Sequence, residues 1–552
     1  MDYLEKLSGL YNELEIKPFC EVKDPIEYMV QMSDGINLRT VVFLPKGREH
    51  VPVVLQRTCY PQNEAICNLH AAEYCRRGFG FVVQWCRGIN GSEGEWEPNV
   101  YDRQDGLDTV NWLSDMPFCD SIGYWGDSYL AYTGWCMADS VPEKVRTMYL
   151  GVYGCLRHTS AYKDGLFRQD ILTAWAMGNA GRKIEADYLE SCRFRPQAEV
   201  DEKLWGLRLN WYRDWITHTD RADEYWKEGL WGRLAEVPAK LKIPVYIREG
   251  WYDHHLGSAL ESCERLSEFA AAHSTIQIGP WNHGYGKAVT KNTDKLVDDS
   301  VSAPFEWFTR ILVNNELPEA KTAMYCIGAD SWIYADGYPL KPESEKKYYL
   351  SALENRKSIE REPVSDSSVS FVYDPENPVM SHGAESLFAT QSEVGSILQP
   401  EPDYRSDVVS FVSGPLAEDI TCAGKIKVKL FVSSDAADTA FTAKLMETDA
   451  EGNTVNVRGT ITTLAFRNGA DIRQKYTPGE IVPVTLEMWD IAWLFKKGVR
   501  LRLDISSSDF PQYSVHPNAE GIWSLQEKTK KAHQTIYCGE KYPSEISLPM
   551  YI

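Results

Sequence analysis

The sequence predicts an α/β domain that is interrupted by a helical insertion and followed by an all-β sandwich of the jelly-roll type. Three observations support this fold class. Apolar, β-branched runs alternate with helical patterns at first, a charged and tryptophan-rich helical stretch then interrupts them, and beyond about Pro318 short strands separated by Gly, Asp and Pro turns dominate. A chain of 552 residues is too long for one hydrophobic core, so several domains are expected.

The strands of the first domain are expected where short apolar runs are rich in valine. Such runs are typical of buried strands in a parallel sheet, and they occupy residues 51–58, 81–85 and 145–154. Between the last two runs, Leu107, Val110 and Leu113 recur at three-residue spacing behind an acidic segment, which predicts a helix with favourable charge in its first turn. Strands resume at "IPVYIREGWYD" and "STIQIGPWNH", so the insertion is expected to divide one α/β domain.

The expected domain boundaries follow these changes in pattern. We assign residues 1–144 and 240–317 to the α/β core, 145–239 to a helical cap, and 318–552 to the sandwich. Within the last region, segments such as "GKIKVKLFVSSD" and "KGVRLRLDISSSDF" read as its strands.

Composition excludes several classes of partner. A net charge of -21 makes nucleic acid and anionic membranes poor partners, because like charges repel. No stretch approaches the roughly 18 consecutive apolar residues of a membrane span, and "MDYLEKLSGLYNELEIKPF" lacks the apolar run of a signal peptide. The 13 cysteines are scattered without a C-x-x-C pair, which favours reduced thiols over disulfides or a zinc site. We therefore expect a cytoplasmic protein without cofactor or metal, and leave homo-oligomer formation open.

The stretch "GYWGDSYLAYTGW" places Ser128 between a strand-like segment and a helix. A G-x-S turn in that context strains the serine backbone and exposes its hydroxyl at the carboxyl edge of the sheet, and Gly126 leaves room for the close approach of the chain. A serine alone is a poor nucleophile, so a carboxylate and a histidine must follow. Asp253 and His283 each stand just past a later strand, where α/β sheets place their chemistry. In this hypothesis His283 takes the proton of Ser128, and Asp253 holds the imidazolium.

These motifs make the chain similar to the cocaine esterase and X-prolyl dipeptidyl-peptidase hydrolases, often called the CocE/NonD group. The matching residues are G-x-S-Y at 126–129, G-W-x-D at 250–253 and G-P-W-x-H at 279–283. The resemblance implies an α/β hydrolase fold with an inserted helical cap and a C-terminal jelly roll. It also implies an oxyanion hole formed by the backbone N–H of Tyr129 and the hydroxyl of Tyr60 in "QRTCYPQNE".

The resemblance implies a serine hydrolase that cleaves an ester or amide bond of a small substrate, or a short peptide, through an acyl-enzyme. An X-prolyl dipeptidyl-peptidase-like aminopeptidase and an acyltransferase would use the same residues. A different class of function is an inactive protein that retains the triad and binds a glycan or a partner through the jelly roll.

The chain departs from the pattern of this group at a few positions. Trp85 stands where the motif after the second strand has a carboxylate, and Arg103 stands where an acidic residue is expected before the helix. We expect the two exchanges to compensate one another. Ala131 replaces the last glycine of the serine motif, a small change that the helix should tolerate.

The substrate pocket is expected to be formed by the cap and the loop after Asp253. Relatives that hydrolyse α-amino acid esters bind the ammonium of the substrate through two acidic residues after the triad aspartate, and this chain has His255 and Leu256 there. Asp164 or Asp170 of the cap could substitute for them. Because His254 and His255 are adjacent and point in different directions, we expect loop exposure and not a shared metal.

Aromatic residues of the cap are a second set of pocket candidates. Relatives that accept aromatic acyl groups line the pocket with aromatic side chains, and here Phe167, Trp175 and Trp205 are available. The alternative for each of these residues is that it packs in the hydrophobic core of the cap.

Overall fold

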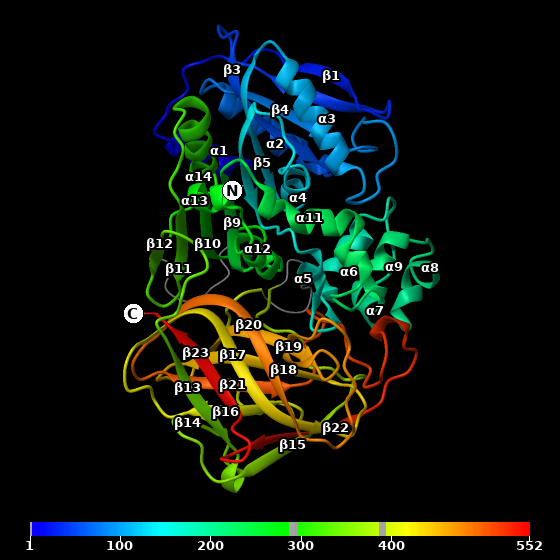
Figure 1. The fold of residues 1–552 in the computed structure, drawn as a ribbon, viewed down its shortest axis with the longest axis vertical. Helices are drawn as coiled ribbons and strands as arrows, with labels where there is room; N and C mark the ends of the chain where they lie inside the picture. Colours follow the sequence, from blue (N-terminus) through cyan, green and yellow to red (C-terminus); the bar gives the residue numbers. More distant parts are fainter. Residues whose placement is uncertain (1–2, 286–292, 294, 386–393, 552) are drawn as a thin grey trace.

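The computed structural model describes residues 3–285, 293, 295–385 and 394–551. Figure 1 shows an α/β part that contains the N-terminus, a β-rich part that contains the last strands of the chain, and a group of helices beside the junction of the two. Among the described residues, no helix has the length and apolar character needed to span a membrane.

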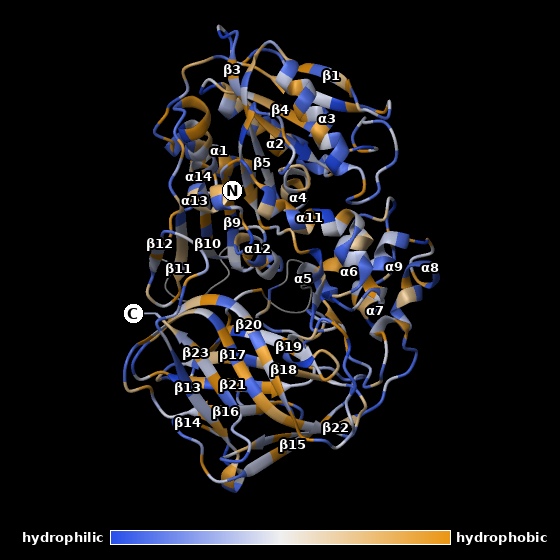
Figure 2. Ribbon diagram, viewed as in Figure 1, coloured by the Kyte–Doolittle hydropathy of each residue, from blue (hydrophilic) through white to orange (hydrophobic). Residues whose placement is uncertain are grey.

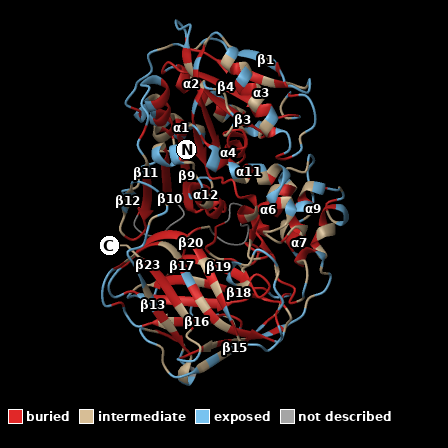
Figure 3. Ribbon diagram, viewed as in Figure 1, coloured by how far each residue is buried: buried red, intermediate tan, exposed pale blue. Residues whose placement is uncertain are grey.

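The first part is built on a ten-stranded sheet with the order β1-β2-β4-β3-β5-β6-β9-β10-β11-β12. Neighbours from β4 to β11 run parallel, and the pairs at both edges are antiparallel. The central strands are buried along almost their whole length (Figure 3), which accounts for their continuous apolar sequences. The strands are β1 Ile26–Gln31, β2 Asn37–Phe43, β3 Val51–Thr58, β4 Gly80–Trp85, β5 Cys119–Asp127, β6 Val145–Gly151, β9 Val245–Tyr252, β10 Thr275–Asn282, β11 Lys321–Cys326 and β12 Ser331–Ala335.

Different helices cover the two faces of this sheet. In β3, Val53 and Leu55 belong to one hydrophobic cluster and Val54 to the other, because successive residues of a strand point to opposite faces. The first face packs against α3, α4 and α12, and the second against α1, α2 and α14. These helices are α1 Tyr3–Glu13, α2 Glu64–Cys75, α3 Asp102–Asp115, α4 Tyr129–Trp135, α12 Leu256–Cys263 and α14 Ser302–Phe308; a further helix, α13 Glu268–His273, precedes β10.

The range expected for the cap, 145–239, begins too early. The strand expected at 145–154 is β6, which lies between β5 and β9 in the sheet, so that range includes one strand of the α/β core. The insertion proper contains the helices and the short hairpin between β6 and β9. Its elements are α5 Arg157–Ala161, β7 Tyr162–Lys163, β8 Leu166–Phe167, α6 Gln169–Gly178, α7 Tyr188–Arg193, α8 Val200–Lys203, α9 Asn210–Thr217, α10 Glu224–Lys227 and α11 Gly229–Lys240.

The second part is a sandwich of eleven hydrogen-bonded strands. Its strands alternate buried and exposed residues, as in β22, and Figure 2 shows the corresponding change between apolar and polar residues along the longest strands. Just beyond the boundary expected at 318, β11 and β12 complete the first sheet, and the strands of the sandwich start at β13. The strands are β13 Ser344–Ser351, β14 Ser358–Glu360, β15 Ser367–Tyr373, β16 Val409–Ser413, β17 Ile420–Ser434, β18 Ala440–Thr448, β19 Thr454–Thr463, β20 Val482–Phe495, β21 Arg500–Ser506, β22 Ala532–Cys538 and β23 Glu545–Met550.

One buried arginine connects the sandwich to the end of β9. Arg458 of β19 is 1% exposed; it donates to the backbone oxygen of Trp251 and, over 2.8 Å, to that of Asp490. Its guanidinium also pairs with Glu385 at 2.7 Å. The indole of Trp251 in turn donates to the backbone oxygen of Tyr325 in β11 over 2.8 Å. The two parts of the chain therefore hold the carboxyl end of β9 between them.

Replacing this arginine should destabilise the folded protein. The change Arg458→Met leaves the Glu385 carboxylate buried without its main cation, and breaking a buried pair in this way costs about 3–5 kcal/mol. The measurement is the free energy of unfolding from urea titration. Lys427→Met is the control, because Lys427 pairs with Glu487 at 3.7 Å on the surface, where such a pair contributes about 0–1 kcal/mol. Equal effects of the two changes would contradict the role of Arg458.

Candidate active site

Ser128 stands at the sharp turn between β5 and α4. Its backbone has φ +58° and ψ -125°, a strained conformation for a residue with a side chain. Gly126 makes the turn sterically feasible, since a Cβ there would lie 2.1 Å from the backbone oxygen of Leu130. The serine is thereby presented at the carboxyl edge of the sheet, as the sequence motif predicted.

The structure brings Ser128, His283 and Asp253 into one hydrogen-bonded chain. Nε2 of His283 lies 2.7 Å from Oγ of Ser128, and Nδ1 of His283 lies 2.5 Å from Oδ2 of Asp253. Asp253 is fully buried, and its second carboxylate oxygen accepts the backbone N–H of His255 over 2.6 Å. The aspartate is thus held on both oxygens, and the imidazole is oriented toward the serine.

Tyr60 and Tyr129 line the same cavity as Ser128. The indole Nε1–H of Trp175 donates to the hydroxyl oxygen of Tyr60 over 3.1 Å, and the hydroxyl retains its own proton as a donor. Burial raises the pKa of Tyr60 well above its usual range, so the hydroxyl keeps its proton. Tyr129 is the first residue of α4, and the N–H groups of a first helical turn have no partner within the helix.

The side chain of Tyr129 is fixed by three contacts. Its hydroxyl donates to the carboxylate of Asp102 over 2.7 Å and accepts the backbone N–H of Asn99 over 2.8 Å. Its ring stacks on Trp175 with centroids 6.0 Å apart. These contacts fix the first residue of α4, and with it the direction of its backbone N–H.

A cavity of about 440 Å³ opens onto the serine. Trp175 and His255 line it, as the sequence analysis expected. Among the residues that the structure describes, no aspartate or glutamate lines this cavity. Its lining consists of Tyr60, Gln62, Asn63, Asn99, Ser128, Tyr129, Tyr153, Arg157, Ile171, Leu172, Trp175, Gly178, Asn179, Trp215, His254, His255 and His283.

The two neighbouring histidines are buried, which corrects the expectation of an exposed loop. His254 is 3% and His255 5% exposed, because the segment after Asp253 turns inward between the cavity and α5. Burial lowers the pKa of both imidazoles well below the usual value, so both are neutral. Nδ1 of His255 is 2.8 Å from the hydroxyl of Ser160.

Asp253, His254 and His283 lie close enough together to be considered as metal ligands, with their potential ligand atoms within 4.8 Å of one another. However, both ring nitrogens of His283 already face partners, one Asp253 and the other Ser128. A metal ion bound by His283 would displace one of these, so the donor set fits a proton relay better than a metal site.

The structure does not place the other pocket candidates in this cavity. The ring of Phe167 is fully buried against Trp523, with centroids 6.0 Å apart, because β8 packs on the sandwich. Trp205 is a core residue whose indole donates to the hydroxyl of Ser191 over 2.9 Å. Asp170 is buried and accepts the hydroxyl of Tyr188.

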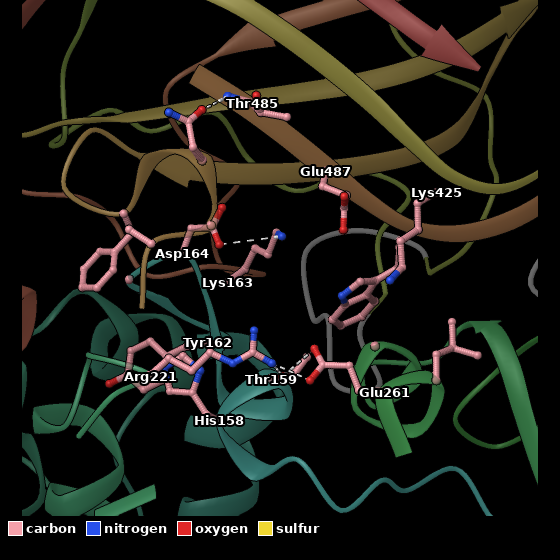
Figure 4. A pocket seen from close by; sticks show the side chains of 18 of the residues that line it. His158, Thr159, Tyr162, Lys163, Asp164, Arg221, Glu261, Lys425, Thr485 and Glu487 are labelled. Carbon is pink, nitrogen blue, oxygen red and sulfur yellow. Dashed lines mark hydrogen bonds and ion pairs between the residues drawn. The ribbon is translucent and has the colours of Figure 1, made fainter. Parts of the chain in front are cut away.

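Asp164 lines a different cavity, of about 320 Å³, between the insertion, α12 and the sandwich (Figure 4). There its carboxylate lies 3.7 Å from the ammonium of Lys163. The nearby ion pair of Arg221 and Glu261 comes from the insertion and from α12. Neither Asp164 nor Asp170, the two acidic residues considered for binding a substrate ammonium, lines the cavity at Ser128.

Trp85 and Arg103, the two residues that depart from the family pattern near the site, each contact a different charged partner. The guanidinium of Arg39 lies over the ring of Trp85, 4.6 Å from its centroid. Arg103 pairs with Asp139 at 2.7 Å. The expected compensation between Trp85 and Arg103 is therefore wrong, because each has its own partner.

Several residues of the site were not found from the sequence. Asp102 belongs to the acidic first turn of α3, which the sequence predicted, but its contact with Tyr129 depends on tertiary packing. Asn99 and Arg157 lie in segments without a recognisable pattern, and Tyr153 belongs to the apolar run at 145–154, which marks a strand and not a site. Only the fold brings these residues to the cavity.

Comparison with known proteins places the chain among hydrolases. The sequence model of the X-Pro dipeptidyl-peptidase (S15) family matches residues 34–285, and that of the X-Pro dipeptidyl-peptidase C-terminal non-catalytic domain matches residues 316–547. Cocaine esterase from Rhodococcus sp. (strain MB1 Bresler) is 26% identical, over 95% of this chain and 97% of the esterase.

Solved structures share the whole architecture. An α-amino acid ester hydrolase has a TM-score of 0.80 at 22% identity, covering 98% of this chain and 99% of that one. An aminopeptidase from a marine sediment archaeon, Thaumarchaeota archaeon, also has a TM-score of 0.80, at 20% identity with 96% of both chains covered. The predicted fold class, an α/β hydrolase domain with a C-terminal β-rich domain, is confirmed.

The hydroxyl of Tyr60 gives a sharp test of this site. Tyr60→Phe keeps the ring and removes one donor near Ser128, so kcat for an ester that the wild type hydrolyses should fall about 10²- to 10³-fold while KM changes little. Steady-state kinetics and thermal melting are measured on the same preparation. Tyr334→Phe, at an exposed position on β12, controls for the substitution itself. A lowered melting temperature with unchanged kcat would assign Tyr60 a purely structural role.

Proposed function

The chain belongs to the CocE/NonD family of serine hydrolases, and from that premise we propose that it cleaves an ester or amide bond of a small substrate through an acyl-enzyme on Ser128. The observation that carries this proposal is the hydrogen-bonded chain from Asp253 through His283 to Ser128.

The proposed reaction begins with attack of Oγ of Ser128 on the carbonyl carbon of the substrate. Nε2 of His283 accepts the serine proton, and the imidazolium is stabilised by the buried carboxylate of Asp253. The tetrahedral intermediate collapses when His283 protonates the leaving alcohol or amine. A water molecule then attacks the acyl-enzyme with the same histidine as base, and the acid leaves as Ser128 regains its proton.

The proposed oxyanion hole consists of the hydroxyl of Tyr60 and the backbone N–H of Tyr129. Both residues line the cavity at Ser128, and both donors are fixed before the reaction by Trp175 and by Asp102. Preorganised donors of this kind stabilise the charge that develops on the carbonyl oxygen.

An X-Pro dipeptidyl-peptidase is the second candidate, since both matching family models carry that name. A peptidase that recognises a free peptide N-terminus needs an anionic group for the ammonium. Within the described residues the cavity offers no carboxylate, which favours an ester or amide substrate without an ammonium group. Acyl transfer to an alcohol or amine would use the same residues and stays an alternative. The non-enzyme alternative is not retained, because the chain belongs to a family of serine hydrolases.

Removal of the Ser128 hydroxyl should abolish turnover without unfolding the protein. Loss of a triad nucleophile lowers kcat by about 10⁴- to 10⁶-fold. The experiment screens acyl esters, amides and X-Pro peptides with wild type and Ser128→Ala, and adds nucleophilic alcohols and amines to detect acyl transfer. Ser114→Ala is the control, since Ser114 lies on α3 and its hydroxyl donates to the backbone oxygen of Val110 in the same helix.

Fluorophosphonate labelling provides an independent measurement of the same residue. The reagent should modify Ser128 in wild type and should leave Ser128→Ala unlabelled. A Ser128→Ala protein that keeps more than a tenth of the wild-type activity, or a labelled peptide elsewhere, would refute the proposed nucleophile.

A further inference from the structure

Arg157 is the one permanently charged side chain among the described residues that line the cavity at Ser128. It is the first residue of α5 and is only 6% exposed. Its guanidinium lies over the ring of Trp215, 4.4 Å from the centroid, and 5.5 Å from that of Trp231. The two tryptophans contact the faces of the guanidinium plane and leave its edge, which carries the N–H groups, for other partners.

No anionic partner for this guanidinium is present in the described part of the chain. Arg157 forms no ion pair with a described carboxylate, and its Nε–H is buried without a hydrogen-bond acceptor there. Other buried arginines of the described chain have carboxylate partners, as Arg458 has Glu385 and Arg248 has Asp299. Buried Arg57 has no carboxylate partner either, but it donates to Gln84 and to the backbone oxygen of Asp102 and does not face the cavity at Ser128. A buried cation without a counter-ion is costly, and an anionic ligand in the cavity offsets that cost.

The remaining lining of the cavity adds no negative charge. His254 and His255 lie near Arg157, and burial together with neighbouring positive charges, Arg157 included, keeps their pKa low. Tyr153 also lines the cavity, and burial raises its pKa to about 12 against the lowering effect of Arg157. The cavity therefore combines an uncompensated positive charge with neutral polar and aromatic groups.

We propose that the substrate carries a carboxylate, in its acyl group or in its leaving group, which pairs with Arg157 when the scissile carbonyl lies at Ser128. This inference rests on the proposed function for its chemistry and adds the substrate class. A carboxylate matches the planar, two-pronged donor edge of a guanidinium, and the surrounding indoles exclude water from the pair. A substrate with an ammonium group would instead be repelled.

The first experiment compares matched substrates on the wild-type enzyme. In the acyl arm, the 4-nitrophenyl monoester of adipic acid is compared with its isostere that ends in a primary amide. In the alcohol arm, the butyrate ester of 4-hydroxybenzoate is compared with that of 4-hydroxybenzamide. We expect kcat/KM to favour the anionic member of one arm by about 10- to 100-fold, the range of a charge-assisted hydrogen-bonded pair.

The second experiment changes the arginine. Arg157→Met keeps much of the packing against the two tryptophans and removes the charge, so the ratio of kcat/KM between the anionic and neutral substrates should fall about 10- to 100-fold. Arg157→Lys keeps the charge and should retain part of the preference. Arg208→Met, at an exposed position of the same insertion, should leave the ratio unchanged.

A binding measurement separates this inference from the proposed function. Titration calorimetry of Ser128→Ala with adipate and with adipamide should detect binding of the dianion only, and Ser128→Ala/Arg157→Met should not bind it. Preference of the wild type for the neutral member in both arms, or adipate binding that survives loss of Arg157, would overturn the carboxylate proposal. Hydrolysis that does not depend on Ser128 would overturn the proposed function, and adipate binding would still decide the role of Arg157.

Discussion

The proposed chemistry depends on one constraint, the fixed position of the carboxyl end of β9. Asp253 follows this strand directly, and His283 must meet it at hydrogen-bond distance while also reaching Ser128. The α/β sheet alone leaves the end of β9 facing the second domain. Arg458 of the sandwich binds the backbone oxygen of Trp251 there, so a residue more than 200 positions away stabilises the loop that carries the carboxylate. The sandwich is in this sense part of the framework of the proposed site.

Charge is distributed unevenly in the proposed site. Two buried carboxylates, Asp253 and Asp102, each have a specific partner, His283 and the hydroxyl of Tyr129. The described lining of the cavity contains neutral groups and the single guanidinium of Arg157. In the proposed reaction the two carboxylates orient proton transfer and the oxyanion donors before the substrate arrives. Arg157 leaves one strong interaction to be made by the substrate itself.

Local sequence predicted the parts of the site whose geometry is local. The turn at Ser128 is encoded by Gly126 and the strand and helix around it, and the positions of Asp253 and His283 follow from the rule that strand ends meet at one edge. What the sequence could not provide was the packing of the insertion. Phe167 faces the sandwich and not the cavity, and the burial of His254 and Arg157 depends on which elements pack against them. β11 and β12 were not assigned to the first sheet for the same reason, since a strand that follows the change of pattern carries no mark of the sheet it joins.

The hydrogen bond between Trp175 and Tyr60 has an evolutionary consequence. Trp175 belongs to the insertion, which shapes the cavity, whereas Tyr60 belongs to the α/β domain and is a proposed donor to the oxyanion. A mutation that reshapes the cavity at Trp175 also releases the hydroxyl that it orients. A mutation of Trp175 is therefore expected to change substrate selectivity and turnover together. A new specificity acquired at Trp175 is expected to require a compensating change at Tyr60 or its neighbours.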